Sequence, residues 1–448
     1  MLYEKHVGYL NMKTRIENVT LLCCDLAQHI YTNSSLTFEN DRIIAINEDV
    51  PYDICIDGKN GILMPGMVNT HTHLSMIPFR SLQDDLPDRL RRFLFPLEKE
   101  AMTQRLAVSA AKIGVAESLL SGVTTVMDMY YYSDALAQVY DSMGIRALVA
   151  QTIVNQNMCD AEDEREGFNI AKTFYEKWVN HPRIIPAFGP HGTTTLTKKT
   201  LIDLKAYTQK HNALVCMHVA EMDDEMAHFR EHNTTPIEFL NSIHLLNSNF
   251  ISVHTIHPTD HDIELLSQHN VGIAHCIGAN IKAAKGIAPL KSFIEQGIRV
   301  GLGTDGPSSG NTLDLFVQMN LVAKCHKVHH HDRKLFPAKE IVQLATMGGA
   351  SVLHLDHLIG SLEVGKKADL VLIETDSVNM YPNHDPYSLL VYSANASNVH
   401  SVWVDGIQKV NNKHLVDYDL KQLKAECDLE STLFNQKLHQ INQTLNIT

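Results

Sequence analysis

Three histidines and one aspartate are the residues of this chain whose types best suit metal binding. His71 and His73 flank a single threonine, and Asp305 lies in a Gly-Leu-Gly-Thr-Asp-Gly segment whose glycines let the backbone turn sharply. An isolated His-x-His pair is more often structural, but His218 and Asp305 complete a set of three imidazoles and one carboxylate. Such a set predicts one divalent cation. Zn²⁺ fits these ligands best, and Fe²⁺ and Mn²⁺ share them.

Two further residues have the chemistry to move protons beside such a cation. Glu221 follows His218 by three residues, close enough to take a proton from bound water and pass it to a substrate nitrogen. The alternative for Glu221 is an acid that stabilises the first turn of a helix. His254 is predicted to hold and polarise the attacking hydroxide, and His257 is its rival. His254 lies at the end of a predicted strand, and this position favours it over His257 for the role.

Eight apolar, β-branched segments are predicted to form the strands that carry these residues. They cover residues 67–73, 123–128, 145–151, 184–191, 214–220, 251–255, 271–276 and 300–305. Amphipathic segments of helical length lie between them, at 104–121, 134–142, 165–179, 197–212, 236–246, 260–269 and 288–296. Eight strands that alternate with helices predict a parallel (β/α)8 barrel of the α/β class.

Polar residues end most of the predicted strands. They are His73, Asp128, His191, His218, His254, His275 and Asp305. In a (β/α)8 barrel the carboxyl ends of all strands open on one face, so side chains far apart in the sequence meet there. The sequence therefore predicts a metal site on that face.

Segments rich in β-branched residues also lie near both ends of the chain. They cover residues 14–22, 42–47 and 54–63 at the front, and 370–374 and 399–410 at the back. We expect both ends to build one small β-sandwich domain, from residues 1–65 and 360–448, beside a barrel of residues 66–359. Residues 434–448 are predicted to be a polar tail, helical or frayed, with few apolar anchors.

Composition excludes several classes of protein. The chain has 448 residues, 44% hydrophobic and 20% charged, values that exclude intrinsic disorder. A formal net charge of −13 opposes binding to nucleic acid. No apolar segment approaches the roughly 18–20 residues of a membrane span, and the N-terminus does not resemble a signal peptide. We therefore expect a cytoplasmic protein, with reduced cysteines, that acts without a membrane.

Several motifs together resemble the amidohydrolase superfamily. They are Pro65-Gly66-Met67-Val68-Asn69-Thr70-His71-Thr72-His73, His218-Val219-Ala220-Glu221, Gly303-Thr304-Asp305-Gly306 and Gly360-Ser361-Leu362-Glu363-Val364-Gly365. Within the superfamily the chain is similar to the branch of chlorohydrolases and nucleobase deaminases, and most of all to the 5'-methylthioadenosine/S-adenosylhomocysteine deaminases. The resemblance spans nearly the whole chain.

The resemblance implies a single metal ion held by His71, His73, His218 and Asp305. Glu221 would be the proton shuttle and His254 would orient the hydroxide, so Glu221, His254 and Asp305 are the predicted catalytic residues. The implied reaction is attack of a metal-activated hydroxide on a ring carbon that carries an amine, with loss of ammonia. Members of this family commonly form homo-oligomers, and the implied partner is a small-molecule substrate.

The resemblance also implies that Glu98 contacts ribose hydroxyls and that His191 contacts the purine. Each has a structural alternative, because Glu98 can begin a helix and His191 can end a strand. Gly192-Thr193-Thr194-Thr195 stands where the deaminases have an aromatic residue that could stack on a base, and Arg165 is a loop cation whose contact with substrate is open. Deamination of guanine or another N-heterocycle, triazine dechlorination, and a non-catalytic scaffold are the alternative functions.

Overall fold

The computed structural model describes residues 12–445, so the interpretation of residues 1–11 as an extension lies outside the described residues. None of the described helices is long and apolar enough to cross a membrane. The chain divides into two compact units. The sheet unit comprises residues 12–68, 118–125 and 314–417, and the barrel unit comprises 69–117, 126–313 and 418–445. The domain boundaries expected at 65/66 and 359/360 stay a prediction.

Eight neighbouring strands form the barrel sheet, in the order of the sequence from β5 to β12. The neighbouring pairs from β7 to β12 are all parallel. They are β5 (Met67–Thr72), β6 (Val123–Tyr130), β7 (Arg146–Ile153), β8 (Ile184–Pro190), β9 (Val215–Val219), β10 (Phe250–His254), β11 (Gly272–His275) and β12 (Arg299–Leu302). Each begins within one residue of a predicted strand and ends within three, and the predicted (β/α)8 barrel is confirmed. Asp305 was expected to end the last strand but follows β12, which ends at Leu302. Buried β-branched residues on both faces are typical of parallel strands covered by helices.

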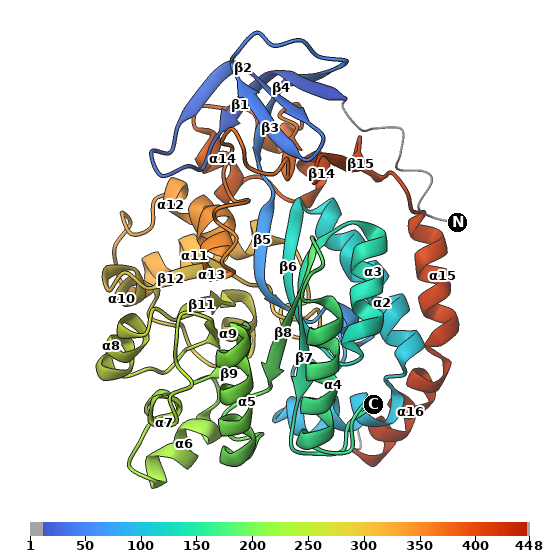
Figure 1. Cartoon of the computed structure of the whole chain (residues 1–448), viewed down its shortest axis with the longest axis vertical. Coiled ribbons are helices and arrows are strands. Elements are labelled where there is room, and N and C mark those ends of the chain that lie inside the picture. Colours follow the sequence, from blue (N-terminus) through green and yellow to red (C-terminus); the bar gives the residue numbers. More distant parts are fainter. Residues whose placement is uncertain (1–11, 446–448) are drawn as a thin grey trace. The chain divides into compact units, whose positions relative to one another are not determined.

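Helices connect the barrel strands, and Figure 1 shows α3 (Ser133–Met143) and α4 (Glu164–Trp178) beside β7 and β8. The other helices of the barrel unit are α1 (Phe95–Ala101), α2 (Gln104–Leu120), α5 (Lys198–His211), α6 (Asp223–Glu231), α7 (Pro236–Ser242), α8 (Asp260–Gln268), α9 (Ile277–Lys282), α10 (Leu290–Glu295), α15 (Leu420–Glu430) and α16 (Thr432–Thr444). A short 3-10 segment (Leu74–Phe79) and a π-helical turn (Leu90–Leu94) follow β5.

Hydrogen bonds join the end of β5 to the segment that follows β12. The Asp305 N–H donates to the His71 carbonyl at 3.1 Å. The Asn69 amide donates to the Thr304 hydroxyl at 2.7 Å, and its oxygen accepts from the Thr304 N–H at 3.1 Å. These bonds bring the first and last strands of the barrel together.

Asp128 does not end its strand, contrary to the sequence-based expectation, because β6 continues to Tyr130. Its carboxylate is buried and accepts hydrogen bonds from the Leu74 N–H at 2.7 Å and the Tyr140 hydroxyl at 2.6 Å. Asp128 therefore secures the chain directly after His73, which is a structural role.

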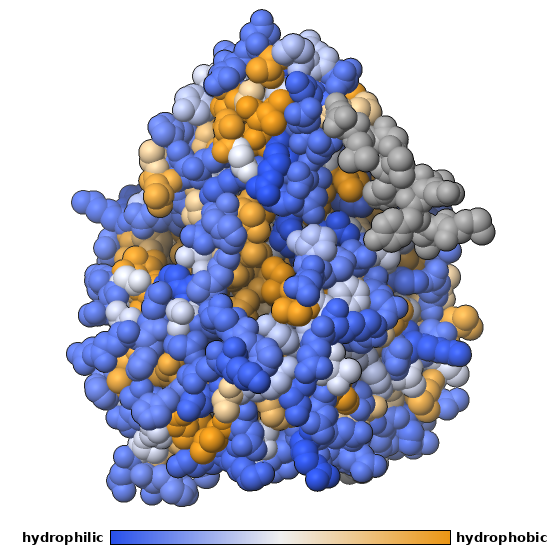
Figure 2. Space-filling view, in the orientation of Figure 1, coloured by the Kyte–Doolittle hydropathy of each residue, from blue (hydrophilic) through white to orange (hydrophobic). Residues whose placement is uncertain are grey.

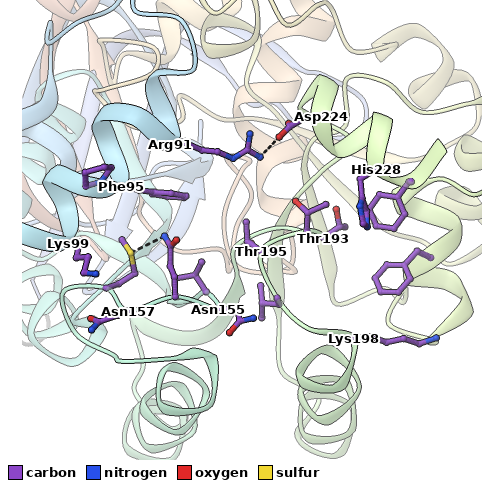
Figure 3. Close-up of a pocket in the computed structure, with 18 of the residues that line it drawn as sticks. Arg91, Phe95, Lys99, Asn155, Asn157, Thr193, Thr195, Lys198, Asp224 and His228 are labelled. Atoms are coloured by element: carbon purple, nitrogen blue, oxygen red, sulfur yellow. Dashed lines mark hydrogen bonds and ion pairs between the residues drawn. The ribbon is translucent and has the colours of Figure 1, made fainter. Parts of the chain in front are cut away.

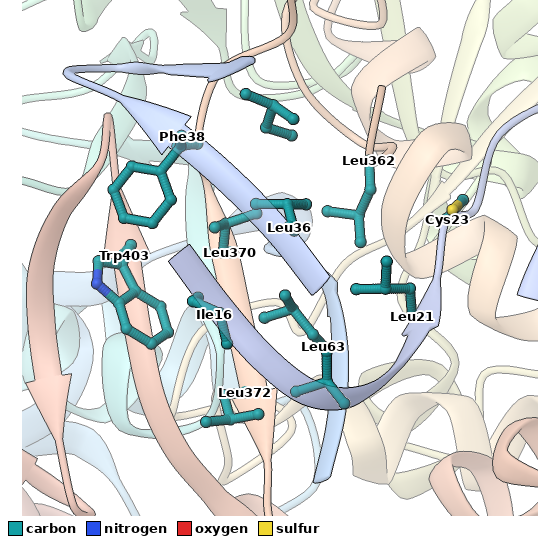
Figure 4. Close-up of a cluster of buried hydrophobic side chains, with 13 residues drawn as sticks. Ile16, Leu21, Cys23, Leu36, Phe38, Leu63, Leu362, Leu370, Leu372 and Trp403 are labelled. Carbon is teal, nitrogen blue, oxygen red and sulfur yellow. The ribbon is translucent and has the colours of Figure 1, made fainter. Parts of the chain in front are cut away.

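The small sheet takes strands from both ends of the chain, as predicted. Its order is β16-β15-β14-β13-β4-β1-β2-β3. The strands are β1 (Lys13–Leu22), β2 (Ile30–Glu39), β3 (Arg42–Ile46), β4 (Ile54–Pro65), β13 (Leu370–Ile373), β14 (Val399–Val404), β15 (Ile407–Asn411) and β16 (His414–Leu415). Figure 4 shows that Ile16, Leu36, Phe38 and Leu63 from the front strands pack with Trp403 from the back ones in one buried cluster. The sheet unit also contains α11 (Leu315–His329), α12 (Ala338–Gln343), α13 (Gly349–Val352), α14 (Pro386–Tyr392), a π-helical turn (Leu344–Gly348) and two 3-10 turns (Val378–Met380 and Ala396–Asn398).

The C-terminal segment has an anchor that the polar sequence did not reveal. Phe434 in α16 is buried and meets Phe79 edge to face, with ring centroids 4.9 Å apart. Aromatic pairs of this kind add to the free energy of burial.

The face seen in Figure 2 is mostly hydrophilic, with scattered apolar patches. The chain as a whole has a formal net charge of −13.

Candidate active site

The four predicted metal ligands converge at the carboxyl ends of β5, β9 and β12. The Nε2 atoms of His71 and His218 lie 3.2 Å apart. Oδ1 of Asp305 lies 3.2 Å from Nε2 of His73 and 3.7 Å from Nε2 of His71. His71, His218 and Asp305 are buried, and the side chain of His73 is 13% exposed. The donor atoms of His71, His73 and Asp305 lie close enough together to share one cation, and so do those of His71, His218 and His254.

Backbone carbonyls orient two of these imidazoles. Nδ1 of His73 lies 2.5 Å from the Met129 carbonyl oxygen, and Nδ1 of His218 lies 2.7 Å from the His191 carbonyl oxygen. A neutral ring that donates from Nδ1 has its lone pair on Nε2, and Nε2 of His73 and of His218 each lie beside another predicted ligand. In the neutral form, both rings can bind a metal ion through Nε2.

The electrostatics of the four side chains also fit a cation. Burial lowers the pKa of His71 and of His218 well below the usual value, so both imidazoles are neutral. Burial raises the pKa of Asp305, but the adjacent His73 outweighs it and keeps the carboxylate ionised. Burial likewise lowers the pKa of His73, and Asp305 outweighs it and raises that pKa to about 9. His73 is therefore protonated beside Asp305, and a divalent cation held by these two side chains would replace that proton.

Glu221 directs its carboxylate into the same site. Its Oε1 lies 3.5 Å from Nε2 of His254 and forms an ion pair with Lys285. Burial raises the pKa of Glu221, but the charges of His254 and Lys285 outweigh it and hold the pKa well below its usual range. The carboxylate is therefore ionised.

The alternative role of Glu221, an acid that stabilises a helix, belongs to Glu225 instead. The Glu225 carboxylate accepts from the Ala220 N–H at 3.2 Å and the Glu221 N–H at 2.9 Å, just before α6. The Thr193 hydroxyl donates to the same carboxylate. These contacts hold the backbone of Ala220, which has a φ of 51°, and so aim the Glu221 side chain.

His254, and not His257, reaches the centre. Nε2 of His254 lies 3.9 Å from Oδ2 of Asp305, while Nδ1 lies 2.8 Å from the amide oxygen of Asn280. Both His254 and Asn280 are buried. His254 and Asp305 line one pocket, and His257 does not line it.

Glu98 and His191 line that same pocket of about 690 Å³, together with His73, Glu221 and His254. Glu98 lies in the first turn of α1, where its Oε1 accepts a 2.7 Å hydrogen bond from the Tyr130 hydroxyl. Burial raises the pKa of Glu98 to about 7, against the lowering effect of Tyr130. Burial also lowers the pKa of His191 to about 4, so its imidazole is neutral.

An aromatic ring stands beside His191 even though Thr193, Thr194 and Thr195 follow it in the sequence. The Phe95 ring meets His191 with centroids 5.4 Å apart. Phe95 also borders a second pocket of about 1130 Å³, which Figure 3 shows with the ion pair between Arg91 and Asp224 at its edge. Arg165, by contrast, is exposed and lines neither pocket.

Residues 62–408 match the pattern of the amidohydrolase family. The chain belongs to the amidohydrolase family. It is 33% identical to a protein of Thermoanaerobacter pseudethanolicus named 5-methylthioadenosine/S-adenosylhomocysteine deaminase, over 92% of this chain and 97% of that one. It is 36% identical to a 5'-deoxyadenosine deaminase of Methanobrevibacter smithii, over 87% of this chain and 91% of that one.

Solved structures agree with this assignment. The amidohydrolase chain matches an adenosine deaminase from Xanthomonas campestris with bound zinc, at a TM-score of 0.92 and 28% identity, over 95% of this chain and 99% of that one. A triazine hydrolase from Arthrobacter matches at a TM-score of 0.87 and 22% identity, over 94% of this chain and 99% of that one. At that identity the second likeness shows the fold alone.

Four residues of the site were not predicted as functional from the sequence: Tyr130, Glu225, Asn280 and Lys285. The sequence gives a partial signal for Asn280, because it lies close to the strand end at His275. Tyr130 was missed because β6 runs two residues past the predicted end at Asp128.

Proposed function

We propose that this amidohydrolase is a metal-dependent hydrolytic deaminase of adenosine-type nucleosides that carry a 5'-thioether, of the 5'-methylthioadenosine and S-adenosylhomocysteine kind. The observation that carries the proposal is the convergence of a metal-ligand set with Glu221 and His254 in one pocket. The names of relatives that are 31–36% identical over most of the chain support the choice of substrate.

One divalent cation is proposed to be held by His71, His73, His218 and Asp305. The neutral imidazoles and the ionised carboxylate described above support this ligand set. When bound, the ion supplies Lewis-acid chemistry, which makes water a nucleophile near neutral pH. Zinc is the proposed ion, because the adenosine deaminase of similar fold contains zinc. The family is metal-dependent, and Fe²⁺ can use the same donors.

Glu221 is proposed to move the proton that the reaction requires. It accepts a proton from the attacking water and delivers it to the ring nitrogen next to the carbon that bears the amine. His254 orients the attacking oxygen through Nε2, and Asp305, whose Oδ2 is 3.9 Å from that nitrogen, takes the second proton of the water and passes it to the amine. The carbon–nitrogen bond then breaks and ammonia leaves.

Glu98 and His191 are proposed to bind the nucleoside. Ribose hydroxyls are donors, and a buried carboxylate that already accepts one hydrogen bond from Tyr130 has acceptor sites left for them. The neutral imidazole of His191 can exchange hydrogen bonds with a purine nitrogen, and the neighbouring Phe95 ring adds an apolar face.

Ammonia release by the metal-loaded protein tests the proposal. The substrates are methylthioadenosine, S-adenosylhomocysteine, adenosine, guanine, cytosine, pterins and aminotriazines, with chloride release from chlorotriazines measured in parallel. Turnover of the nucleosides is expected. Turnover of free bases or triazines alone would contradict the nucleoside assignment, and no turnover with metal bound would favour a non-catalytic scaffold. Light scattering of the same preparation tests the predicted homo-oligomer.

A further inference from the structure

Lys285 contacts the proposed proton shuttle but has no place in the mechanism above. Its ammonium forms an ion pair and hydrogen bond with Oε1 of Glu221. The two side chains are only 24% and 13% exposed, so solvent screens their attraction weakly. Lys285 also lines the 690 Å³ pocket together with His254 and Asp305. The contact thus lies inside the active site.

The backbone around Lys285 aims the side chain at this position. Ala284 has a φ of 54° and Gly286 a φ of 124°, so the chain turns sharply on both sides of Lys285. A Cβ at Gly286 would lie 3.0 Å from Cγ2 of Ile256, closer than ordinary contact. The Lys285 N–H donates to the Asn280 carbonyl at 3.0 Å. Asn280 therefore holds Lys285 through its backbone and His254 through its side chain.

The neighbouring cations of the pocket are engaged elsewhere. Lys282, the last residue of α9, donates hydrogen bonds to Asp84 at 2.8 Å and to Asn311 at 2.9 Å. Arg91 pairs with Asp224. Lys285 is directed instead at Glu221, and it shares Oε1 with His254.

We propose that Lys285 is a positioning residue for the proton shuttle, in which its ammonium and His254 hold Oε1 of Glu221 so that Oε2 exchanges the proton with the substrate. The inference rests on the proposed deaminase function. A carboxylate with one oxygen held by two partners loses rotational freedom, and proton transfer depends on the orientation of the transferring group. Lys285 acts through Glu221 and need not touch the substrate.

Kinetics of three variants test this role. Lys285→Met keeps the length of the side chain but removes the charge, and should lower kcat by about 10- to 100-fold, part of the roughly 10²–10⁴ that proton transfer contributes. KM should change less than about 3-fold, because the substrate is not bound by Lys285. Lys285→Arg should return kcat to within about 5-fold of wild type. Lys291→Met makes the same change on the surface of α10 and should leave kcat unaltered.

A double variant separates this role from a structural one. In a Glu221→Gln background, Lys285→Met should change the residual kcat by less than about 2-fold, because its target is gone. Equal losses in both backgrounds would contradict the inference. Thermal unfolding supplies a readout that needs no substrate: the loss of Tm in the double variant should be smaller than the sum of the two single losses. Additive losses would show that the ion pair does not form.

The remaining outcomes separate the inference from the function on which it rests. A wild-type protein without turnover on the whole panel contradicts the proposed function and removes the reaction assigned to Lys285. An active wild type whose Lys285→Met variant keeps its kcat contradicts the inference alone. A rise in kcat also overturns it, because the ammonium would then hold Glu221 away from the substrate.

Discussion

The amide oxygen of Asn280 lies 2.8 Å from Nδ1 of His254, and both side chains are buried. An amide oxygen only accepts hydrogen bonds, so the proton of the imidazole is on Nδ1. Nε2 of His254 faces Glu221 and Asp305. The hydrogen bond to Asn280 thus directs Nε2, and not Nδ1, towards these carboxylates.

Replacing Asn280 should disturb the orientation of the His254 ring without removing a proposed metal ligand. We expect Asn280→Ala to lower kcat by about 10- to 100-fold, the usual size of such orienting contacts, and to keep the metal bound. Steady-state kinetics and metal analysis of the same preparation check this. An unchanged kcat would mean that His254 is oriented by other contacts.

Glu221→Gln should separate metal binding from proton transfer. The amide has nearly the shape of the acid but cannot accept a proton, so kcat is expected to fall by about 10²- to 10⁴-fold or more. Metal content should equal that of wild type, since Glu221 is outside the proposed ligand set. Retained turnover would remove the proton-shuttle role.

The barrel, and the proximity of the four proposed ligands, could be predicted from the sequence because both depend on local patterns. Runs of β-branched residues gave the eight strands, and the parallel arrangement brings their carboxyl ends together. His218 and Asp305 could thus be placed beside His71 although they lie far away in the sequence.

Side-chain direction in loops could not be predicted in this way. Lys285 points at Glu221 only because Ala284 and Gly286 have positive φ, and alanine gives no sequence signal for that conformation. Asp128 ended a predicted strand but lies inside β6, since Met129 and Tyr130 continue the strand and are buried. The residue types in a short segment do not show where a strand ends or which way a loop side chain points.

Glu98 should control the choice between nucleosides and free bases. Glu98→Ala is expected to raise KM for nucleosides by roughly tenfold or more, the cost of losing a charged hydrogen bond, and to spare free bases. The comparison of adenosine with adenine checks this. Equal losses for both ligands would remove the ribose assignment.

Glu98 should also make stability depend on pH. Burial raises its pKa to about 7 from a usual value of 4.5, so the folded protein binds more protons than the unfolded chain between these values. This contribution to stability is fully present below pH 4.5 and is lost as the pH rises through 7. The Glu98→Gln variant has no carboxyl group at this position, so its stability lacks this dependence on pH. The Tm of wild type minus that of Glu98→Gln should therefore fall between pH 5 and 8, and a flat difference would contradict the burial of an acid here.

Metal binding should stabilise the folded chain. A cation that binds only the folded state raises Tm as its free concentration exceeds Kd, by about 2.7 kcal/mol of unfolding free energy at 100 times Kd. We expect added Zn²⁺ to raise the Tm of chelator-treated protein, and the shift to vanish in His73→Ala. Lys291→Met provides the control, with a wild-type shift. A full shift in His73→Ala would exclude His73 as a ligand.

The hydrogen bond from the Asp305 N–H to the His71 carbonyl has a consequence for how the protein reaches its active form. His71 lies in the first strand of the barrel and Asp305 follows the last one, so the proposed ligand set joins residues that are far apart in the sequence. No fragment of the barrel synthesised before residue 305 would contain all four proposed ligands. Tight metal binding should therefore occur only after the whole barrel has folded. A nascent or truncated chain that lacks Asp305 should not bind the ion tightly.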